Sequence, residues 1–303
     1  MVLSIFTSAK HFGDPWVGHA GLNRMGLHGA RVRGAHAMAA FRRWQSVRAN
    51  TPAERELLAN GVVAIRNVLP EREFRELHAE VRARLAQARA ETPYPAPDAS
   101  GFGQPQHHEW GFDRFDGGTL NRFVKRGPLA EEFAQLPRLR RLSRIVTGRA
   151  HDWQDGWIYE TLAGAEDSAP DIQAAFHRDT FFGAMKYWYY LEPVTKADGP
   201  LVYVPQSHLL TRKRIDWEAR RAAAAMAAKG AGDPSGTSGS FRVAEEDIAA
   251  LGLPDPVHFT VPANTLVVAN IFGFHRRGEA EPGSRRLSLY GYHRRRPFQL
   301  IGR

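Results

Sequence analysis

The chain contains no cysteine among its 303 residues. This absence excludes disulfides, cysteine-ligated zinc sites, iron–sulfur clusters and thiol nucleophiles, and it is typical of proteins in a reducing compartment. The sequence also lacks an uncharged apolar stretch of the roughly 18 residues that a membrane-spanning helix needs, and no charged region precedes the short apolar run at its N-terminus, as it would in a signal peptide. We therefore expect a cytoplasmic protein, at most peripheral on the inner face of a membrane.

Acidic residues are missing from part of the N-terminal region. Residues 1–50 form a basic leader, in which the stretch from Gly21 to Arg48 has no Asp or Glu and interleaves apolar side chains with six arginines: Arg24, Arg31, Arg33, Arg42, Arg43 and Arg48. Such a stretch is typical of a helix packed on a core with its arginines in solvent, or of a helix lying on an anionic membrane surface. The formal net charge of +9 also suggests an anionic partner. Nucleic acid is the less favoured one, because no zinc finger or RNA-binding signature is present.

Helical and strand patterns follow the leader. Residues 52–60 read as a helix that ends at Gly61, and a β-branched run follows over 62–68. Apolar residues with a period of 3.6 predict a helix over 71–90, and a helix pair is expected over 128–147. The Pro- and Gly-rich residues 91–118 read as a loop.

From Trp153 onward, short aromatic and β-branched runs alternate with turns, which is typical of antiparallel strands in a sandwich or barrel. Residues 212–252 interrupt these runs as a helical insert, within which the segment GAGDPSGTSGS is expected to be mobile. The predicted fold is an all-β core with flanking helices, in which an N-terminal helical layer lies over the β-rich C-terminal half. Residues 1–50 are expected to be a basic leader, helical and peripheral, and residues 51–303 a single domain.

One pair of residues in the β-rich half could bind a metal ion. His177 and Asp179 are two apart, so on a strand their side chains would share one face and could reach the same ion. The pair alone is a weak signal. A rival group, His107-His108-Glu109, lies in the expected loop with no strand to orient it.

The residues that follow strengthen the metal hypothesis. His275 comes after the apolar run NTLVVANIF, and Arg286 follows 11 residues later. Two imidazoles and one carboxylate form the facial triad of non-haem Fe(II) oxygenases, which leaves open positions for a 2-oxo acid and O2. The planar guanidinium of Arg286 is suited to the far carboxylate of 2-oxoglutarate.

The run HRDTFFGAMKYWYYLEPVTKADGPLVYVPQSH resembles the core of phytanoyl-CoA dioxygenase-like proteins. The shared features are His-x-Asp, an aromatic strand, the turn Asp198-Gly199, and a Pro-x-Ser-His segment in which Gln206 replaces the usual Gly. The segment ANGVVAIRNVLPEREFRELHAEVRARL is similar to the opening strand and helix of the family, so the resemblance covers residues 55–298. It implies a double-stranded β-helix that binds Fe(II) and 2-oxoglutarate and uses O2.

By this resemblance, His177, Asp179 and His275 bind iron and Arg286 binds 2-oxoglutarate, with Arg285 as the rival arginine. Leu287 and Leu289 are expected on the opposite face of the strand from Arg286. The resemblance also suggests co-substrate contacts for Trp188 and Tyr159, in whose place Trp157, Lys186 or Tyr190 could serve. His208 is interpreted as a structural histidine at a strand end.

The predicted reaction is hydroxylation of a C–H bond. Because Asp179 occupies the position that a halide would need, hydroxylation is favoured over halogenation. The basic composition favours an anionic small molecule or lipid headgroup, with Kdo, the acidic sugar of lipopolysaccharide, as the leading candidate. The alternatives are an acyl group bound to CoA or a carrier, a secondary metabolite, and nucleic-acid binding through the leader.

Overall fold

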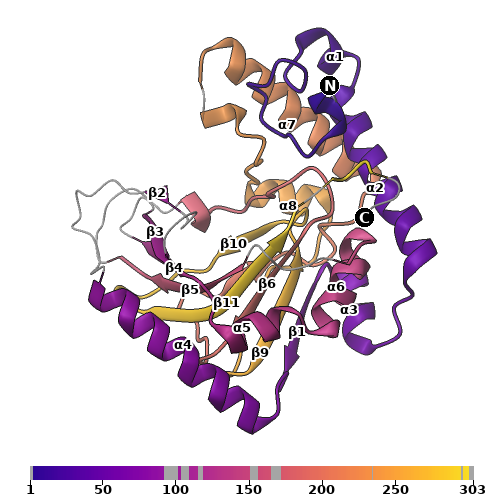
Figure 1. Cartoon of the computed structure of the whole chain (residues 1–303). Coiled ribbons are helices and arrows are strands. Elements are labelled where there is room, and N and C mark those ends of the chain that lie inside the picture. The colour runs from indigo at the N-terminus through magenta and orange to yellow at the C-terminus, as the bar shows by residue number, and fades with distance from the viewer. Residues whose placement is uncertain are drawn as a thin grey trace.

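The computed structural model describes residues 3–91, 102–103, 109–114, 119–150, 156–164, 172–233, 235–294 and 296–299. Within these ranges, two antiparallel sheets form the centre of the molecule (Figure 1). The large sheet has eight strands in the order β1-β9-β6-β11-β5-β4-β3-β2, and the small one has three in the order β10-β7-β8. The strands are β1 (Val62–Arg66), β2 (Phe102–Gly103), β3 (Trp110–Arg114), β4 (Leu120–Val124), β5 (Gly156–Leu162), β6 (Met185–Tyr190), β7 (Leu201–Tyr203), β8 (Val257–His258), β9 (Thr265–Asn270), β10 (His275–Arg277) and β11 (Arg285–His293).

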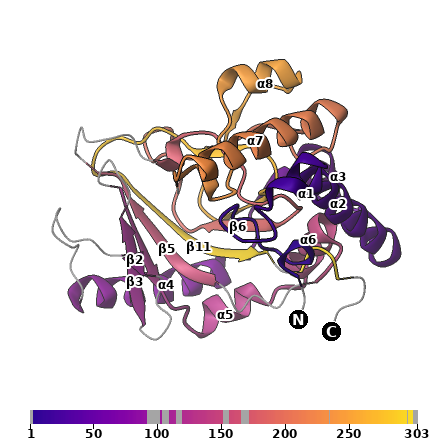
Figure 2. The same cartoon turned by 90° about the horizontal axis from the view of Figure 1, so that it is seen from above.

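Helices cover one face of the large sheet. The α-helices of the described residues are α1 (Ala20–Arg24), α2 (Leu27–Ser46), α3 (Pro52–Asn60), α4 (Glu71–Glu91), α5 (Pro128–Ala134), α6 (Pro137–Thr147), α7 (Arg212–Gly230) and α8 (Glu245–Leu251). The apolar faces of α3 to α6 pack with inward side chains of β4, β5, β6, β9 and β11 in one continuous core. Figure 2 shows α4 and α5 along one side of the strands, with α7 and α8 on the other. The expected helices over 52–60, 71–90 and 128–147 are all present.

Successive side chains of a strand point to opposite faces of its sheet, so the two faces of the large sheet carry different residues. On β6, Tyr187 and Tyr189 join the core under the helices. The intervening residues Lys186, Trp188 and Tyr190 face the opposite way and line a cavity between the two sheets. The large sheet therefore has a dry face under the helices and a face that, together with the small sheet, builds a site.

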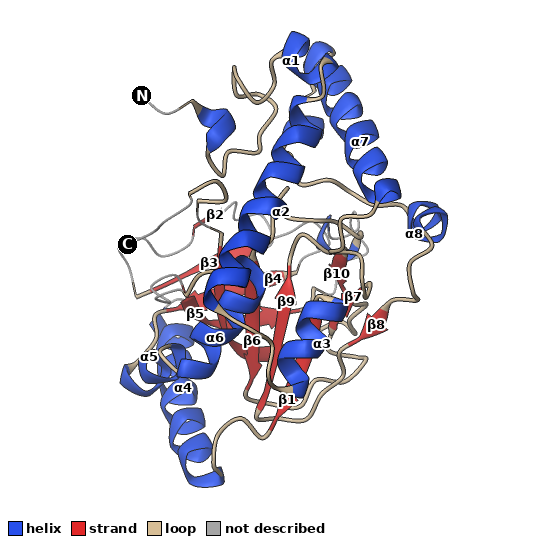
Figure 3. Cartoon of the chain, turned by 90° about the vertical axis from the view of Figure 1, so that its right-hand side faces the viewer, coloured by secondary structure: helices blue, strands red, loops and turns tan. Residues whose placement is uncertain are grey.

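The leader folds against α7, and several of its basic side chains are buried. Figure 3 shows α2 running beside α7, and residues of the two helices are in contact. Arg31 and Arg42 are 5% and 7% exposed, whereas we expected the leader arginines in solvent. The Arg42 guanidinium donates to the carbonyls of Thr147 and Pro297 at 3.2 and 3.1 Å. These arginines are inside because backbone carbonyls satisfy their donors, without which their burial would be unfavourable.

One expectation about a loop is corrected, and a second loop makes a contact with the leader. Residues 91–118 are not all loop, because β2 and β3 lie within them and pair with each other, and β3 also pairs with β4. The segment GAGDPSGTSGS, expected to be mobile, is held in part by the leader: the backbone N–H of Phe12 donates to the Thr237 carbonyl at 2.8 Å. The insert itself is helical as predicted, with α7 and α8 within residues 212–252.

Among the residues that the structure describes, no helix is both long and apolar enough to span a bilayer.

Candidate functional site

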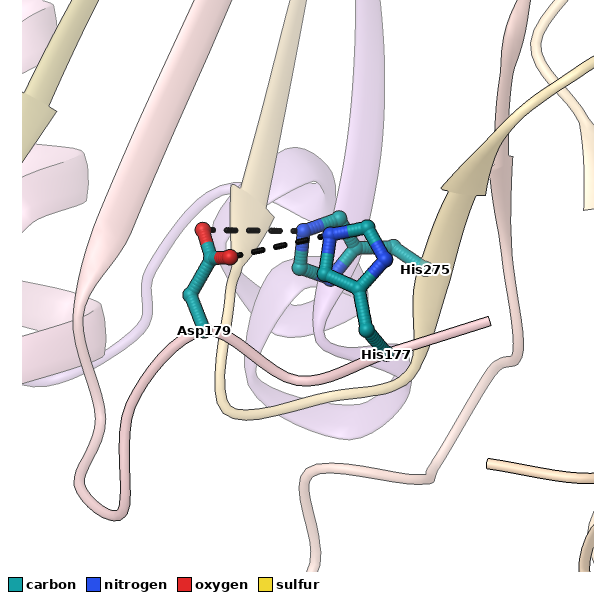
Figure 4. A group of neighbouring side chains, drawn as sticks. All are labelled: His177, Asp179 and His275. Atoms are coloured by element: carbon teal, nitrogen blue, oxygen red, sulfur yellow. Dashed lines mark ion pairs between the residues drawn. The ribbon is translucent and has the colours of Figure 1, made fainter. Parts of the chain in front are cut away.

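Three potential metal ligands converge at one end of the cavity. One ligand atom from each of His177, Asp179 and His275 lies within 4.8 Å of the other two, and all three residues are buried. His177 Nε2 is 3.6 Å from Asp179 Oδ1, and His275 Nε2 is 3.7 Å from Asp179 Oδ2. Figure 4 shows both imidazole rings turned toward the carboxylate. The fold thus brings together residues that are nearly 100 positions apart in the sequence.

The segment that carries His177 and Asp179 is extended but does not belong to a regular strand, contrary to our expectation. It is held by isolated backbone bonds to three different parts of the chain. His177 exchanges N–H to carbonyl bonds with His275 at 3.0 and 2.9 Å, Arg178 N–H donates to the Phe241 carbonyl at 3.0 Å, and Asp179 N–H donates to the Ile271 carbonyl at 3.0 Å. His275 opens β10 and pairs with Tyr203 of β7. The two histidines are therefore neighbours by direct backbone pairing.

Backbone carbonyls orient both imidazoles. Nδ1 of His177 lies 2.8 Å from the Ala175 carbonyl, and Nδ1 of His275 lies 3.0 Å from the Gly273 carbonyl. A carbonyl accepts only, so each Nδ1 carries the proton and each Nε2 presents its lone pair to the site. Burial lowers the pKa of His177 well below its ordinary value, which keeps that imidazole neutral, as a metal ligand must be.

Cations surround the carboxylate. Lys186 Nζ and an Arg294 guanidinium nitrogen lie 2.6 and 2.7 Å from Asp179 Oδ2. Burial acts to raise the pKa of Asp179, but Lys186 and Arg294 outweigh it and hold that pKa well below its ordinary value. Asp179 is therefore ionised, as a metal ligand would be, and the two cations more than offset its single negative charge.

The donor set fits an Fe(II) ion. His275 Nε2 is buried, and among the described residues it has no hydrogen-bond partner. A buried nitrogen without a partner is unfavourable unless something binds it. Two neutral imidazoles and one carboxylate on one side of an ion are the facial set of non-haem Fe(II) sites. Together they could hold iron and leave its cavity side open.

The residues expected to contact 2-oxoglutarate lie in the cavity. Arg286 is buried there, whereas its rival Arg285 is exposed at the start of β11. Arg286 Nη1 donates to the carbonyl of Gly199, whose positive φ of 61° forms the expected turn. Leu287 and Leu289 lie in the core on the opposite face, as expected.

Most of the aromatic candidates share this cavity. Trp188 and Tyr159 line it, and so do their rivals Lys186 and Tyr190. Trp157 packs in the same apolar cluster without lining the cavity. Trp157 is therefore disfavoured as a contact of 2-oxoglutarate, whereas Lys186 and Tyr190 remain alternatives to Trp188 and Tyr159.

Sequence reasoning missed Arg294 beside Asp179 and two cationic residues of the cavity. Arg276 and Arg277 line the cavity beside His275, and Gln173 joins them from the short helix before His177. The arginines directly follow a candidate ligand in the sequence, which could have drawn attention to them. Among the described residues, the cavity lining includes four Lys or Arg side chains and, apart from Asp179 at its end, no carboxylate: Lys186, Arg276, Arg277 and Arg286.

The other histidines singled out in the sequence are elsewhere. His208 is bonded through Nε2 to the Leu58 carbonyl at 3.1 Å, which fits the structural role expected of it. His107 and His108 lie outside the described residues. Glu109, the third member of that group, forms ion pairs with Arg84 and Lys125.

Comparisons with known proteins agree with this site. The family model for phytanoyl-CoA dioxygenase matches residues 57–236, more than half of the chain. No curated protein matches the sequence. The non-haem alpha-ketoglutarate-dependent epimerase SnoN from nogalamycin biosynthesis has a TM-score of 0.50 and 19% identity, over 80% of this chain and 81% of that one.

Two further solved structures are less similar. EctD from S. alaskensis with bound Fe gives a TM-score of 0.45 at 14% identity, over 80% of this chain and 76% of that one. HygX from Streptomyces hygroscopicus, with nickel and 2-oxoglutarate bound, gives a TM-score of 0.43 at 15% identity, over 81% of this chain and 88% of that one. The likeness to SnoN shows the fold, and the family match shows the class of enzyme. The chain belongs to the phytanoyl-CoA dioxygenase family and is a 2-oxoglutarate-dependent non-haem iron oxygenase.

Proposed function

We propose that His177, Asp179 and His275 bind Fe(II), that Arg286 binds 2-oxoglutarate, and that the enzyme hydroxylates a C–H bond of an anionic small molecule. The observation that carries the proposal is the convergence of the three ligands at a cavity lined by cations and aromatic rings. Iron with 2-oxoglutarate and O2 supplies the oxidising chemistry that cleaves such a bond.

The residues of the chain then have separate tasks. The guanidinium of Arg286, steadied by the Gly199 carbonyl, offers a planar pair of donors to the distal carboxylate of 2-oxoglutarate. Trp188 and Tyr159 form an apolar wall of the cavity, which we propose contacts 2-oxoglutarate and excludes water from it. Lys186 stays close to Asp179 and orients its second oxygen.

Charge supports an anionic substrate. Arg286 is assigned to 2-oxoglutarate and Lys186 is paired with Asp179, and two further arginines, Arg276 and Arg277 on β10, also line the cavity. Their cationic groups complement a carboxylate or phosphate of the substrate. Candidates of this class are an acidic secondary metabolite, an acyl group bound to CoA or a carrier, and the Kdo sugar of lipopolysaccharide.

The first test is anaerobic titration of the apo-protein with Fe(II) and 2-oxoglutarate, followed by the visible charge-transfer band of the chelate. We expect the band to vanish in His177→Ala, and Arg286→Gln to require at least 10-fold more 2-oxoglutarate. Arg285→Gln is the matched control, because Arg285 is adjacent in sequence but exposed; it should titrate like the wild type. If the wild type, Arg286→Gln and Arg285→Gln all required the same concentration of 2-oxoglutarate, the role of Arg286 would be contradicted.

The second test identifies the substrate class. The assay measures how far each candidate substrate stimulates 2-oxoglutarate consumption. Acidic secondary metabolites are tested first, because SnoN acts in nogalamycin biosynthesis, and CoA thioesters and Kdo follow. Each acid is compared with its neutral amide or ester. We expect the acids to stimulate turnover, and Arg277→Gln to raise KM for an acid more than it raises KM for the neutral amide or ester of that acid. Preference for the neutral forms would refute the anionic-substrate proposal.

Peripheral binding to an anionic membrane is the proposed partner interaction of the leader. Phe41 and Trp44 are 43% and 76% exposed on the outer side of α2. Arg33 is exposed on the same side of the helix, and α2 contains no acidic residue. Exposed aromatic and basic side chains on one helix face suit an anionic lipid surface. Co-sedimentation with anionic vesicles should fall in Trp44→Ser. The control is Leu129→Ser, which changes an exposed apolar residue on α5 and should bind as the wild type does. Equal binding by the two variants would refute membrane binding through α2.

A further inference from the structure

The leader reaches the metal-ligand segment, although it lies outside the residues that match the family model. Two contacts connect the leader to residues His177–Asp179, one through a buried ion pair and one directly to the backbone.

The first contact begins at Arg178, between the two proposed ligands. Its guanidinium donates to Glu218 Oε1 at 2.9 Å and to Oε2 at 2.7 Å, and its third nitrogen donates to the Gly239 carbonyl at 2.6 Å. Arg178 and Glu218 are both fully buried. Such a bidentate pair fixes the orientation of both side chains. Because the neighbours of Arg178 are the proposed ligands, this pair fixes the backbone that carries them.

The leader completes this ion pair. Nε2 of His28, on α2, lies 2.8 Å from Glu218 Oε2. The ring of His28 also packs against Phe12 and Phe241. The guanidinium of Arg178 lies 4.0 Å from the centre of the Phe241 ring. His28 of the leader, Glu218 of α7 and Arg178 of the ligand segment therefore form one buried cluster.

The second contact is direct. Lys10 Nζ donates to the backbone carbonyl of Asp179 at 2.6 Å and also to Ser240 Oγ. Lys10 is held in place by its own segment, because Arg31 on α2 donates to three carbonyls just before it: Ile5 at 2.9 Å, Thr7 at 3.2 Å and Ala9 at 2.5 Å. Arg31 also lies over Phe181, 4.1 Å from the ring centre.

We propose that the leader positions the iron ligands, with Lys10 fixing the Asp179 backbone and His28 fixing the Glu218–Arg178 pair. Lys10 and His28 are positioning residues, since neither is a ligand. The ligand segment has few ladder bonds of its own, because it is not part of a regular strand. Outer contacts of this kind orient the ligands of a metal and typically change its affinity by 10–100-fold. This inference rests on the proposed ligand set.

The test measures metal affinity without turnover. Mn(II) is titrated into the full-length apo-protein, and free Mn(II) is followed by its electron paramagnetic resonance signal. We expect Lys10→Met to weaken Mn(II) binding about 10-fold, while Lys10→Arg, which keeps a donor, restores most of it. The matched control is Lys229→Met. Lys229 Nζ donates to the leader carbonyl of Gly18 at 2.9 Å but makes no recorded bond to the ligand segment, so its loss should leave Mn(II) affinity within twofold.

A second pair of variants tests the other contact. His28→Leu removes the donor to Glu218 with little change in volume, and we expect it to weaken Mn(II) binding at least fivefold; His28→Gln keeps a donor and should recover affinity. The inference is overturned if folded Lys10→Met and His28→Leu bind Mn(II) as the wild type does, or if Lys229→Met weakens binding as much as Lys10→Met. Absence of Mn(II) binding by the wild type, or unchanged binding by His177→Ala, would instead overturn the proposed ligand set.

Discussion

Glu218 provides a strong test of how this molecule is held together. Its side chain is fully buried and is contacted by two arginines and one histidine: Arg178, Arg214 and His28. Glu218→Gln keeps the shape but removes the negative charge, which leaves the two guanidiniums buried without compensation. Loss of one partner of a buried ion pair costs about 3–5 kcal/mol, so we expect the free energy of unfolding of the apo-protein to fall by about that much.

The assay is urea unfolding of the apo-protein at pH 7, followed by tryptophan fluorescence and circular dichroism. The matched control is Glu76→Gln, which breaks an ion pair with Arg72 on the exposed side of α4 and should leave the midpoint within error. A fall of less than about 1 kcal/mol in Glu218→Gln would refute the reasoning. It would mean that the backbone carbonyls alone satisfy the two arginines.

The same variant has a defined pH dependence. Burial acts to raise the pKa of Glu218, but Arg178, His28 and Arg214 outweigh it and hold that pKa well below its ordinary value of 4.5. A carboxyl with a lowered folded-state pKa stabilises the fold above its unfolded pKa, and this contribution is lost as the pH falls through the folded value. The difference in unfolding free energy between wild type and Glu218→Gln should therefore be largest above pH 4.5 and shrink below it. A constant difference across that range would contradict the assignment.

Three further predictions concern backbone, packing and metal. Gln206 has a φ of +65° where the family usually has Gly, so Gln206→Gly should raise the unfolding free energy by about 1 kcal/mol, measured in urea; a destabilised variant would refute this. A Cβ on Gly273 would lie 1.8 Å from the Tyr203 hydroxyl, so Gly273→Ala should destabilise by about 1–3 kcal/mol, and adding Tyr203→Phe should recover part of the loss. Mn(II) at 100 times its Kd should raise the unfolding free energy by about 2.7 kcal/mol, and His177→Ala should abolish that rise in a thermal melt.

Local sequence patterns determined most of the elements and the chemistry of the site. The period of 3.6 over 71–90 predicted α4, because an apolar stripe needs a surface to cover. The identities of His177, Asp179 and His275 defined a donor set for Fe(II). The period of two placed Arg286 opposite Leu287 and Leu289, as strand geometry requires.

Only the tertiary structure decided which charges are free to bind a ligand. In the leader, Arg31 and Arg42 look the same in the sequence as the exposed Arg24 and Arg33, yet the first two are buried on backbone carbonyls. The burial of these two arginines depends on backbone carbonyls up to about 255 residues away, and no local sequence pattern predicts such partners. Likewise, Arg178 lies between two proposed ligands in the sequence, but its partner Glu218 comes from a helix 40 residues on. Residue type and spacing fix what each side chain can do, whereas long-range packing fixes which partner it meets.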